Sequence, residues 1–174
     1  MNSTIFFPNL WRFVGLVAVQ VVILSQVAVL ANGYCNILIY PLFILFLPIQ
    51  LATPTAVMLG FAVGLTVDFM TGHIGVNASA GAISGYARAV ILHRFAPRGG
   101  YTGKELVPSP EYFGWRWYLS VTSIFFAIHI FWYFSMVYFT PVYLMAKILP
   151  QSIIGWILTM IIAVLYTRLF HPKI

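Results

Sequence analysis

The feature that most restricts the fold of this chain is a series of long apolar stretches with almost no charge inside them. The stretch VGLVAVQVVILSQVAVL, residues 14–30, is typical, because it lacks the strict alternation that a membrane β-strand would show. Only 7% of the 174 residues are charged, whereas a soluble domain carries about a quarter. The sequence therefore predicts an all-α polytopic membrane protein, since helices satisfy their own backbone hydrogen bonds in lipid.

One helical crossing of the hydrocarbon core needs about 20 apolar residues. On this basis we expect a single transmembrane domain, residues 1–174, with six spans at Leu10–Leu30, Asn36–Gln50, Thr53–Met70, Gly75–Phe95, Trp117–Phe139 and Gln151–Leu169. The first stretch is longer than the core of a signal peptide, about 7–15 residues, so we expect it to be retained. The second span is short and contains Pro41 and Pro48, which break helices. We expect it to lie partly inside the bundle, where neighbours can satisfy the freed carbonyls.

The basic residues predict the orientation of the spans, because cytoplasmic loops are enriched in Lys and Arg. With six spans, one side of the membrane receives only Lys147, and the other receives Arg12, Arg94, Arg98, Lys104, Arg116, Arg168 and Lys173. We therefore expect a multi-pass membrane protein with both termini and the loop 96–116 in the cytoplasm. This bias also explains the net charge of +6, which favours anionic membrane lipids and gives no indication of nucleic-acid binding.

Few residues in the sequence could carry catalysis or bind a metal. The chain has one cysteine, four histidines and three acids, Asp68, Glu105 and Glu111. One cysteine cannot form an intrachain disulfide or a thiolate metal site. Metal-assisted transfer reactions typically need several acids, and Asp68 is the only acid in the predicted spans. We therefore expect no metal, no cofactor and no enzymatic activity.

The third and fourth spans carry a pattern of small residues that predicts close helix packing. Gly60, Gly64 and Asp68 follow at intervals of four and so lie on one helix face. The fourth span carries small or polar residues along two adjacent stripes, which include Asn77, Ala78, Gly81, Ser84, Gly85 and Arg88. The connection TGHIG is short, so the two spans form an antiparallel hairpin. Its small faces allow close approach and pack either on each other and on this bundle or on a partner helix.

Three polar side chains in the spans each leave two interpretations open. Asp68 either caps the amides at the start of the fourth helix or bonds Asn77, or else it contacts a proton, a solute or a partner protein. An ion pair between Asp68 and Arg88 is not expected, because Arg88 lies about 20 Å deeper. Arg88 either snorkels toward the cytoplasmic headgroups or has a polar partner in the bundle. His129 is either a hydrogen-bonded side chain in a helix interface or part of a proton relay.

The segment GLTVDFMTGHIGVNASAG, residues 64–81, resembles the G-L-x-x-D-x-x-x-x-x-x-G-x-x-A segment of the rod shape-determining protein MreD family. LFILFLPIQ before it and RFAPRGGYTGKELVPSPEYFGW after it extend the resemblance. The family positions fall on Gly64, Asp68, Gly75 and Ala78. The resemblance implies six helices around a central cavity, as in the substrate-binding subunits of energy-coupling-factor transporters.

The resemblance also implies a non-catalytic role in the machinery that elongates the bacterial cell wall. The partner would be the single-pass protein MreC, and through it a RodA-like glycosyltransferase, a class B penicillin-binding protein and the MreB filament. In this hypothesis Gly64 and Gly85 belong to the surface that binds MreC. The alternative is a carrier subunit that binds a small molecule or a lipid in a cavity. Asp68 and the polar residues Asn77, Ser84, Arg88 and His129 would then be candidates to line that cavity.

Overall fold

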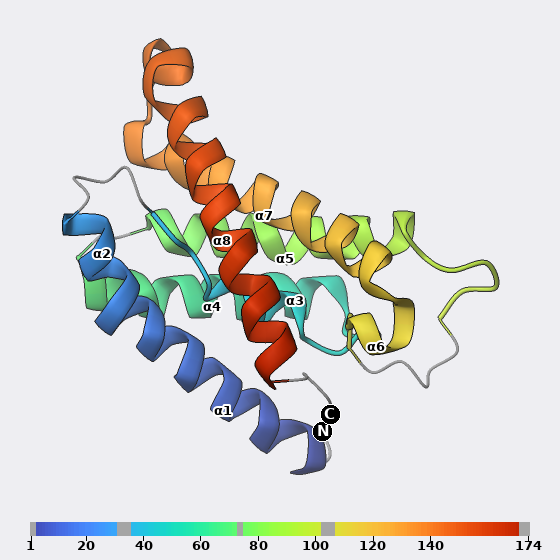
Figure 1. Cartoon of the computed structure of the whole chain (residues 1–174). Coiled ribbons are helices and arrows are strands. Elements are labelled where there is room, and N and C mark those ends of the chain that lie inside the picture. Colours follow the sequence, from blue (N-terminus) through green and yellow to red (C-terminus); the bar gives the residue numbers. More distant parts are fainter. Residues whose placement is uncertain (1–2, 31–35, 73–74, 102–106, 171–174) are drawn as a thin grey trace.

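The computed structural model describes residues 3–30, 36–72, 75–101 and 107–170, and within these ranges all regular secondary structure is helical. Figure 1 shows the helices as one bundle, in which the start of the first helix and the end of the last lie at the same end. In chain order the elements are α1 (Ser3–Val19), η1 (Gln20–Leu24), α2 (Ser25–Leu30), α3 (Pro41–Leu45), α4 (Thr53–Thr71), α5 (Val76–Arg94), α6 (Pro110–Phe113), α7 (Trp115–Tyr138), η2 (Pro141–Tyr143), η3 (Leu144–Ile148) and α8 (Leu149–Phe170).

Four helical stretches in the described part of the chain are long and apolar enough to cross a membrane: Asn9–Ala28, Thr53–Thr71, Trp115–Tyr138 and Pro141–Phe170. They correspond to the first, third, fifth and sixth expected spans. The last one begins ten residues earlier than expected, because η2 and η3 continue into α8. The fourth expected span forms the helix α5, which has 19 residues but is not among these four. Its polar side chains face neighbouring helices, as described below, so its composition is less apolar.

The second expected span, Asn36–Gln50, is not a membrane-length helix, and this part of the six-span prediction is wrong. Residues 36–39 have no regular secondary structure, and α3 covers only Pro41–Leu45. Pro41 starts α3, where a missing amide hydrogen costs nothing, and Pro48 follows after the helix has ended. All residues from Leu38 to Leu47 are buried, as expected for irregular backbone that lies inside a helix bundle.

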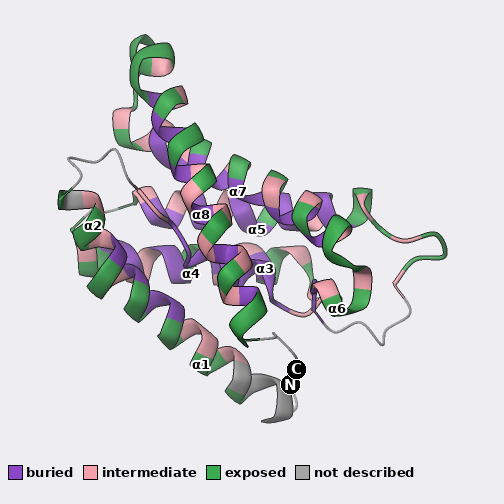
Figure 2. Ribbon diagram, viewed as in Figure 1, coloured by how far each residue is buried: buried purple, intermediate pink, exposed green. Residues whose placement is uncertain are grey.

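The hairpin of α4 and α5 forms the centre of the bundle. α4 ends at Gly72, whose left-handed backbone (φ 77°) lets its amide donate to the carbonyl of Asp68 (2.8 Å). α5 packs most extensively on α4 and next on α7, and α7 packs on α8. Buried residues concentrate on α3, α5 and the inner faces of α4 and α7, whereas α1 shows many exposed residues (Figure 2). The core between these layers contains Phe46, Phe125 and Phe126, all fully buried.

The expected loop 96–116 folds back on the bundle where it is described. The hydroxyl of Tyr101 donates to the carbonyl of Leu92 (2.7 Å), and the indole of Trp117 donates to that of Phe95 (2.7 Å). Val107 is fully buried, and Lys104 lies outside the described residues. The described parts of this loop therefore pack at the end of the bundle where α5 ends and α7 begins (Figure 1).

Candidate functional site

The glycines of the α4–α5 hairpin face each other at backbone contact distance. A Cβ atom added at Gly60 would lie closer than 3.0 Å to the carbonyl of Gly81, and one at Gly81 would meet the carbonyl of Gly60 in the same way. Gly64 lies against the carbonyl of Asn77 and Gly85 against that of Ala56, again at less than 3.0 Å from an added Cβ. The stripe of small residues is thus used inside the hairpin, where glycine allows two helix backbones to touch.

This packing decides between the two alternatives for the small faces. In the MreC hypothesis Gly64 and Gly85 contact a partner helix, but both residues are buried against the other helix of the hairpin. The small faces therefore pack against helices of the same bundle, which is the first of the two alternatives. A larger residue at either position would therefore disturb the fold before it could affect a partner.

Asp68 accepts four hydrogen bonds at the start of α5. Its Oδ2 accepts from the amides of Gly75 (3.0 Å) and Ala78 (2.8 Å), and its Oδ1 accepts from the amide and the side-chain Nδ2 of Asn77 (3.0 and 2.9 Å). Gly75 stands at the N-cap position with φ 90° and has no side chain to bond the first amides of the helix. The carboxylate from α4 performs this role instead, at the end of the helix where the dipole favours an anion.

Asp68 therefore caps the start of α5 and bonds Asn77, as its first interpretation predicts. Asp68 is 1% exposed and Asn77 is 3% exposed, so the carboxylate contacts neither lipid nor solvent. Gly75 and Ala78, two positions of the family motif, supply two of the four donors, and Gly64 supplies the space in which Asn77 approaches α4. The motif positions in this chain thus form one unit, a buried clamp that joins the end of α4 to the start of α5.

Arg88 is buried, with 2% of its surface exposed, so the interpretation that it snorkels to the headgroups is wrong. Its guanidinium donates to the carbonyls of Leu45 (Nε, 3.2 Å), Leu47 (Nη2, 2.5 Å) and Pro48 (Nη2, 3.0 Å). These carbonyls belong to the end of α3 and the turn after it, where proline leaves acceptors without helical donors. The polar partner of Arg88 is therefore the broken segment between residues 36 and 50.

His129 lies in the interface between α7 and α5, as one of its two interpretations predicts. Its Nδ1 is 2.7 Å from the hydroxyl oxygen of Ser84, which also donates to the carbonyl of Ala80 (2.7 Å). With that donation made, Nδ1 is the donor to Ser84. The ring of Tyr40 packs edge-on against His129 at 5.2 Å between centroids, and its hydroxyl donates to the carbonyl of Asn77 (3.2 Å).

The possible cavity residues do not meet at one site. Asn77, Ser84, Arg88 and His129 are all at most 3% exposed, and their bonds go to three places: the Asp68 clamp, the Ser84–His129 pair and the α3 carbonyls. The carrier alternative expected a ligand among these side chains. The structure instead uses them to join helices to one another.

Sequence reasoning missed two side chains that hold residues 36–40, which we call the extended segment. Gln20 donates to the carbonyl of Ile37 (3.0 Å) and accepts from the amide of Ile39 (2.8 Å), so its amide group imitates a neighbouring strand. The hydroxyl of Thr159 in α8 accepts from the amide of Leu38 (3.1 Å). Gln20 is a polar residue inside the apolar stretch 14–30, which is the signal that could have identified it, because a buried amide in lipid needs a partner.

In the described part of the chain, no group of three or more His, Cys, Asp or Glu side chains is placed to hold a metal ion. The fold and the clamp together define a class of protein, an all-helical bundle with four helices suited to cross a membrane. Comparisons with protein-family models, with curated proteins and with solved structures gave no match.

Proposed function

We propose that this chain is a non-catalytic membrane subunit that holds the transmembrane helix of a single-pass partner, as the resemblance to MreD-like proteins implies for MreC. In this proposal it supports lateral cell-wall synthesis and cell shape, and it acts through MreC on a RodA-like glycosyltransferase, a class B penicillin-binding protein and the MreB filament. The observation that carries the proposal is the use of the interior polar groups. Asp68 and Arg88 bond to backbone groups of this chain, which suits a scaffold better than a carrier or an enzyme.

The orientation of the bundle fits the same role. Arg94 and Arg116 flank the loop at one end of the bundle, and Arg168 lies in the last turn of α8. That end also holds the start of α1 and the end of α8 (Figure 1). By the positive-inside rule we assign this end to the cytoplasm. The resemblance to MreD-like proteins implies that the membrane is the cytoplasmic (inner) membrane. The loop then faces the side on which a cytoplasmic filament such as MreB lies.

Because polar side chains of this chain fill the interior, a partner helix would bind on the outer surface. One groove on that surface is formed by α1, α4 and the broken segment that contains α3. The groove between α1 and α4 has a volume of about 520 Å³ and is floored by Phe43 and Leu47 of the broken segment. Its walls are Phe13 of α1 and Leu59 and Ala62 of α4. A small residue in an apolar groove allows a partner helix to approach closely, so we place the membrane segment of MreC here.

The proposed position of the partner helix is tested with Ala62→Phe, which fills the groove, and with Val90→Phe as a control. Val90 is 51% exposed on α5 and does not line the groove. We expect Ala62→Phe to reduce co-purification of an MreC-type partner from detergent-solubilised membranes about thirtyfold, which corresponds to the loss of about 2 kcal/mol that is typical of a central interface residue. The control should retain the partner, and both variants should elute as the folded protein in size-exclusion chromatography.

Two results would contradict parts of this proposal separately. Normal co-purification by Ala62→Phe would exclude the α1–α4 groove as the docking surface. Absence of any MreC-type partner with the unchanged protein, when native membranes are solubilised gently, would contradict the proposed function itself.

A further inference from the structure

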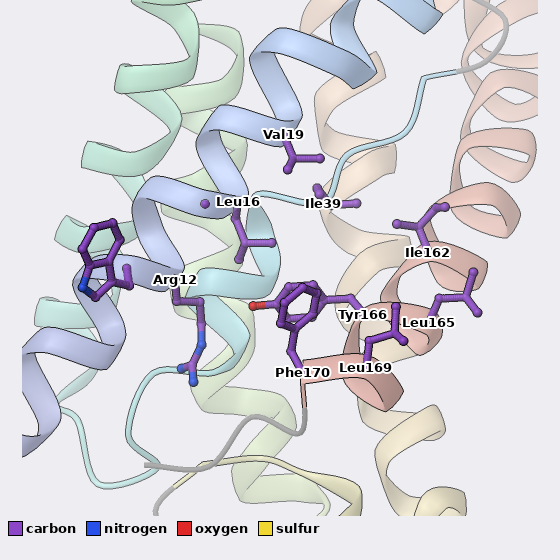
Figure 3. Close-up of a pocket in the computed structure, with 11 residues that line it drawn as sticks. Arg12, Leu16, Val19, Ile39, Ile162, Leu165, Tyr166, Leu169 and Phe170 are labelled. Atoms are coloured by element: carbon purple, nitrogen blue, oxygen red, sulfur yellow. The ribbon is translucent and has the colours of Figure 1, made fainter.

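A second groove lies on the opposite side of α1, between α1 and α8, and has a volume of about 550 Å³ (Figure 3). Its walls are apolar over most of their length: Leu16 and Val19 come from α1, Ile39 from the extended segment, and Ile162 and Leu165 from α8. Arg12 is the one charged side chain among the residues that line it, all of which lie in the described part of the chain. The groove therefore combines a long apolar wall with a single positive charge.

The charge of Arg12 is held in place by neutral groups. Its Nη1 donates to the side-chain oxygen of Asn9 (3.1 Å) and to the carbonyl of Phe46 (3.2 Å), and its guanidinium carbon lies 5.4 Å from the centre of the Phe46 ring. These contacts place the guanidinium among uncharged groups. It carries five N–H donors, more than these contacts and its hydrogen bond with Tyr166 use. Figure 3 shows the hydroxyl of Tyr166 turned toward the same side chain. An anion would thus meet several donors at one point.

The charged end of the groove is the end nearest the chain termini. Arg12 and Phe170 line this end, whereas Val19 lines the other, seven residues or about 10 Å further along α1. Trp11, which is 73% exposed, stands beside Arg12, in the position that interfacial tryptophans occupy at the headgroup level. The apolar part of the groove then extends from the headgroups toward the middle of the bilayer.

We propose that this groove binds one anionic phospholipid from the leaflet on the side of the termini. The acyl chain lies along Leu16, Val19 and Leu165, and the phosphate accepts hydrogen bonds from Arg12 and Tyr166. Arginine binds phosphate through several charge-assisted hydrogen bonds. An anionic lipid can therefore neutralise the positive charge of Arg12, which an apolar helix of a partner protein could not do. The site depends on the location of the chain in a membrane and is independent of the MreC proposal, which concerns the other side of α1.

Native mass spectrometry of the full-length protein in detergent micelles tests this site, with phosphatidylglycerol as the anionic probe and phosphatidylcholine as the neutral one. We expect the unchanged protein to retain one phosphatidylglycerol in preference to phosphatidylcholine. Arg12→Gln should weaken phosphatidylglycerol binding on the order of tenfold, through loss of charge-assisted hydrogen bonds. Arg116→Gln is the matched control, because Arg116 is exposed outside the groove.

A second variant keeps the test valid if Arg12→Gln does not fold. A Cβ added at Gly15, which lines the groove, would meet nothing within 4 Å, so Gly15→Phe should fold and occupy the space of the acyl chain. We expect it to lose phosphatidylglycerol, and Val14→Phe, next to it and outside both grooves, to retain it. Inorganic phosphate at millimolar concentration should not displace the lipid, because it cannot use the apolar wall.

Three results would overturn the proposal: equal retention of phosphatidylcholine and phosphatidylglycerol, unchanged phosphatidylglycerol binding in both Arg12→Gln and Gly15→Phe, or displacement of the lipid by inorganic phosphate. A partner helix that co-purifies with the unchanged protein and is lost in Gly15→Phe, with no lipid bound in either case, would assign the groove to a protein instead.

Discussion

Asp68 and Arg88 are the two charged side chains that lie buried in the described part of the chain. They do not form an ion pair, and each compensates its charge with backbone dipoles: Asp68 accepts from the amides at the start of α5, and Arg88 donates to the carbonyls after α3. A hydrogen bond to a charged group contributes about 1.5–3 kcal/mol. Each side chain therefore joins two segments of the bundle that have no continuous backbone hydrogen bonding between them.

Gly→Ala substitutions at Gly64 and Gly15 measure how much close helix contact contributes to stability, because only Gly64 lies against another helix. We expect Gly64→Ala to lower the free energy of unfolding by about 1–3 kcal/mol, because its Cβ would overlap the carbonyl of Asn77. Gly15→Ala meets nothing within 4 Å and should be neutral or stabilising by up to about 1 kcal/mol, since alanine is the better helix former. Thermal unfolding of both variants in the same detergent, followed by circular dichroism, measures the difference. Equal midpoints for the two variants would contradict the backbone contact.

The extended segment at residues 36–40 depends on side chains of other helices for its backbone hydrogen bonds. Gln20 serves the groups of Ile37 and Ile39, and Thr159 serves the amide of Leu38. Gly155 of α8 lies against the carbonyl of Asn36, which an added Cβ would approach to 2.9 Å. The segment is thus fixed between the N-terminal and C-terminal helices, and it positions α3 for the contacts with Arg88.

Gln20→Leu tests how far this segment relies on one side chain. It leaves the partly buried carbonyl of Ile37 and the buried amide of Ile39 without this partner, so we expect a loss of about 1–3 kcal/mol and faster hydrogen exchange at the amide of Ile39. Gln26→Leu makes the same substitution at an exposed residue of α2 and should change neither quantity. Hydrogen exchange followed by mass spectrometry resolves the peptide that contains Ile39. An unchanged exchange rate there in Gln20→Leu would show that the segment is held without Gln20.

The hairpin could be predicted from sequence because its signal is local. The spacing of four between Gly60, Gly64 and Asp68 places them on one face of a helix, and a short connection requires the partner helix to follow directly. Pro41 and Pro48 likewise predicted an interrupted segment inside the bundle. The acid of the clamp and its donors are seven to ten residues apart, so the capping role was among the interpretations that the sequence allowed.

The rest depended on contacts between distant parts of the chain. Leu38 and Thr159 are 121 residues apart, and no spacing rule connects them. The sequence left two directions open for the Arg88 side chain, because its acceptors exist only where the α3 segment ends as an irregular turn beside α5. The central position of α5 also explains its polar composition, since a helix enclosed by α4, α7 and α3 needs less apolar surface toward lipid.

At the scale of the whole molecule, a closed core is combined with an N-terminal helix that has a groove on each side. α4, α5 and α7 enclose the polar groups. α1 has the groove toward α4 on one side and the groove toward α8 on the other (Figure 3). We place a partner helix in the first groove and an anionic lipid in the second. Both proposals use the outer surface, and both require the α4–α5 hairpin to remain closed.

The free energy of unfolding of Asp68→Ala, with Glu111→Ala as the control, tests this account most directly. Glu111 is an exposed acid on α6, so its removal should cost much less than removal of the buried Asp68, because exposed polar interactions contribute little to stability. We predict that Asp68→Ala loses about 3 kcal/mol or more, because four donors, three of them in buried hydrogen bonds, lose their acceptor. Asp68→Asn should lose less, because it keeps one acceptor oxygen. A fully stable Asp68→Ala protein that no longer binds its partner would contradict the account, since the carboxylate would then serve a contact outside this chain.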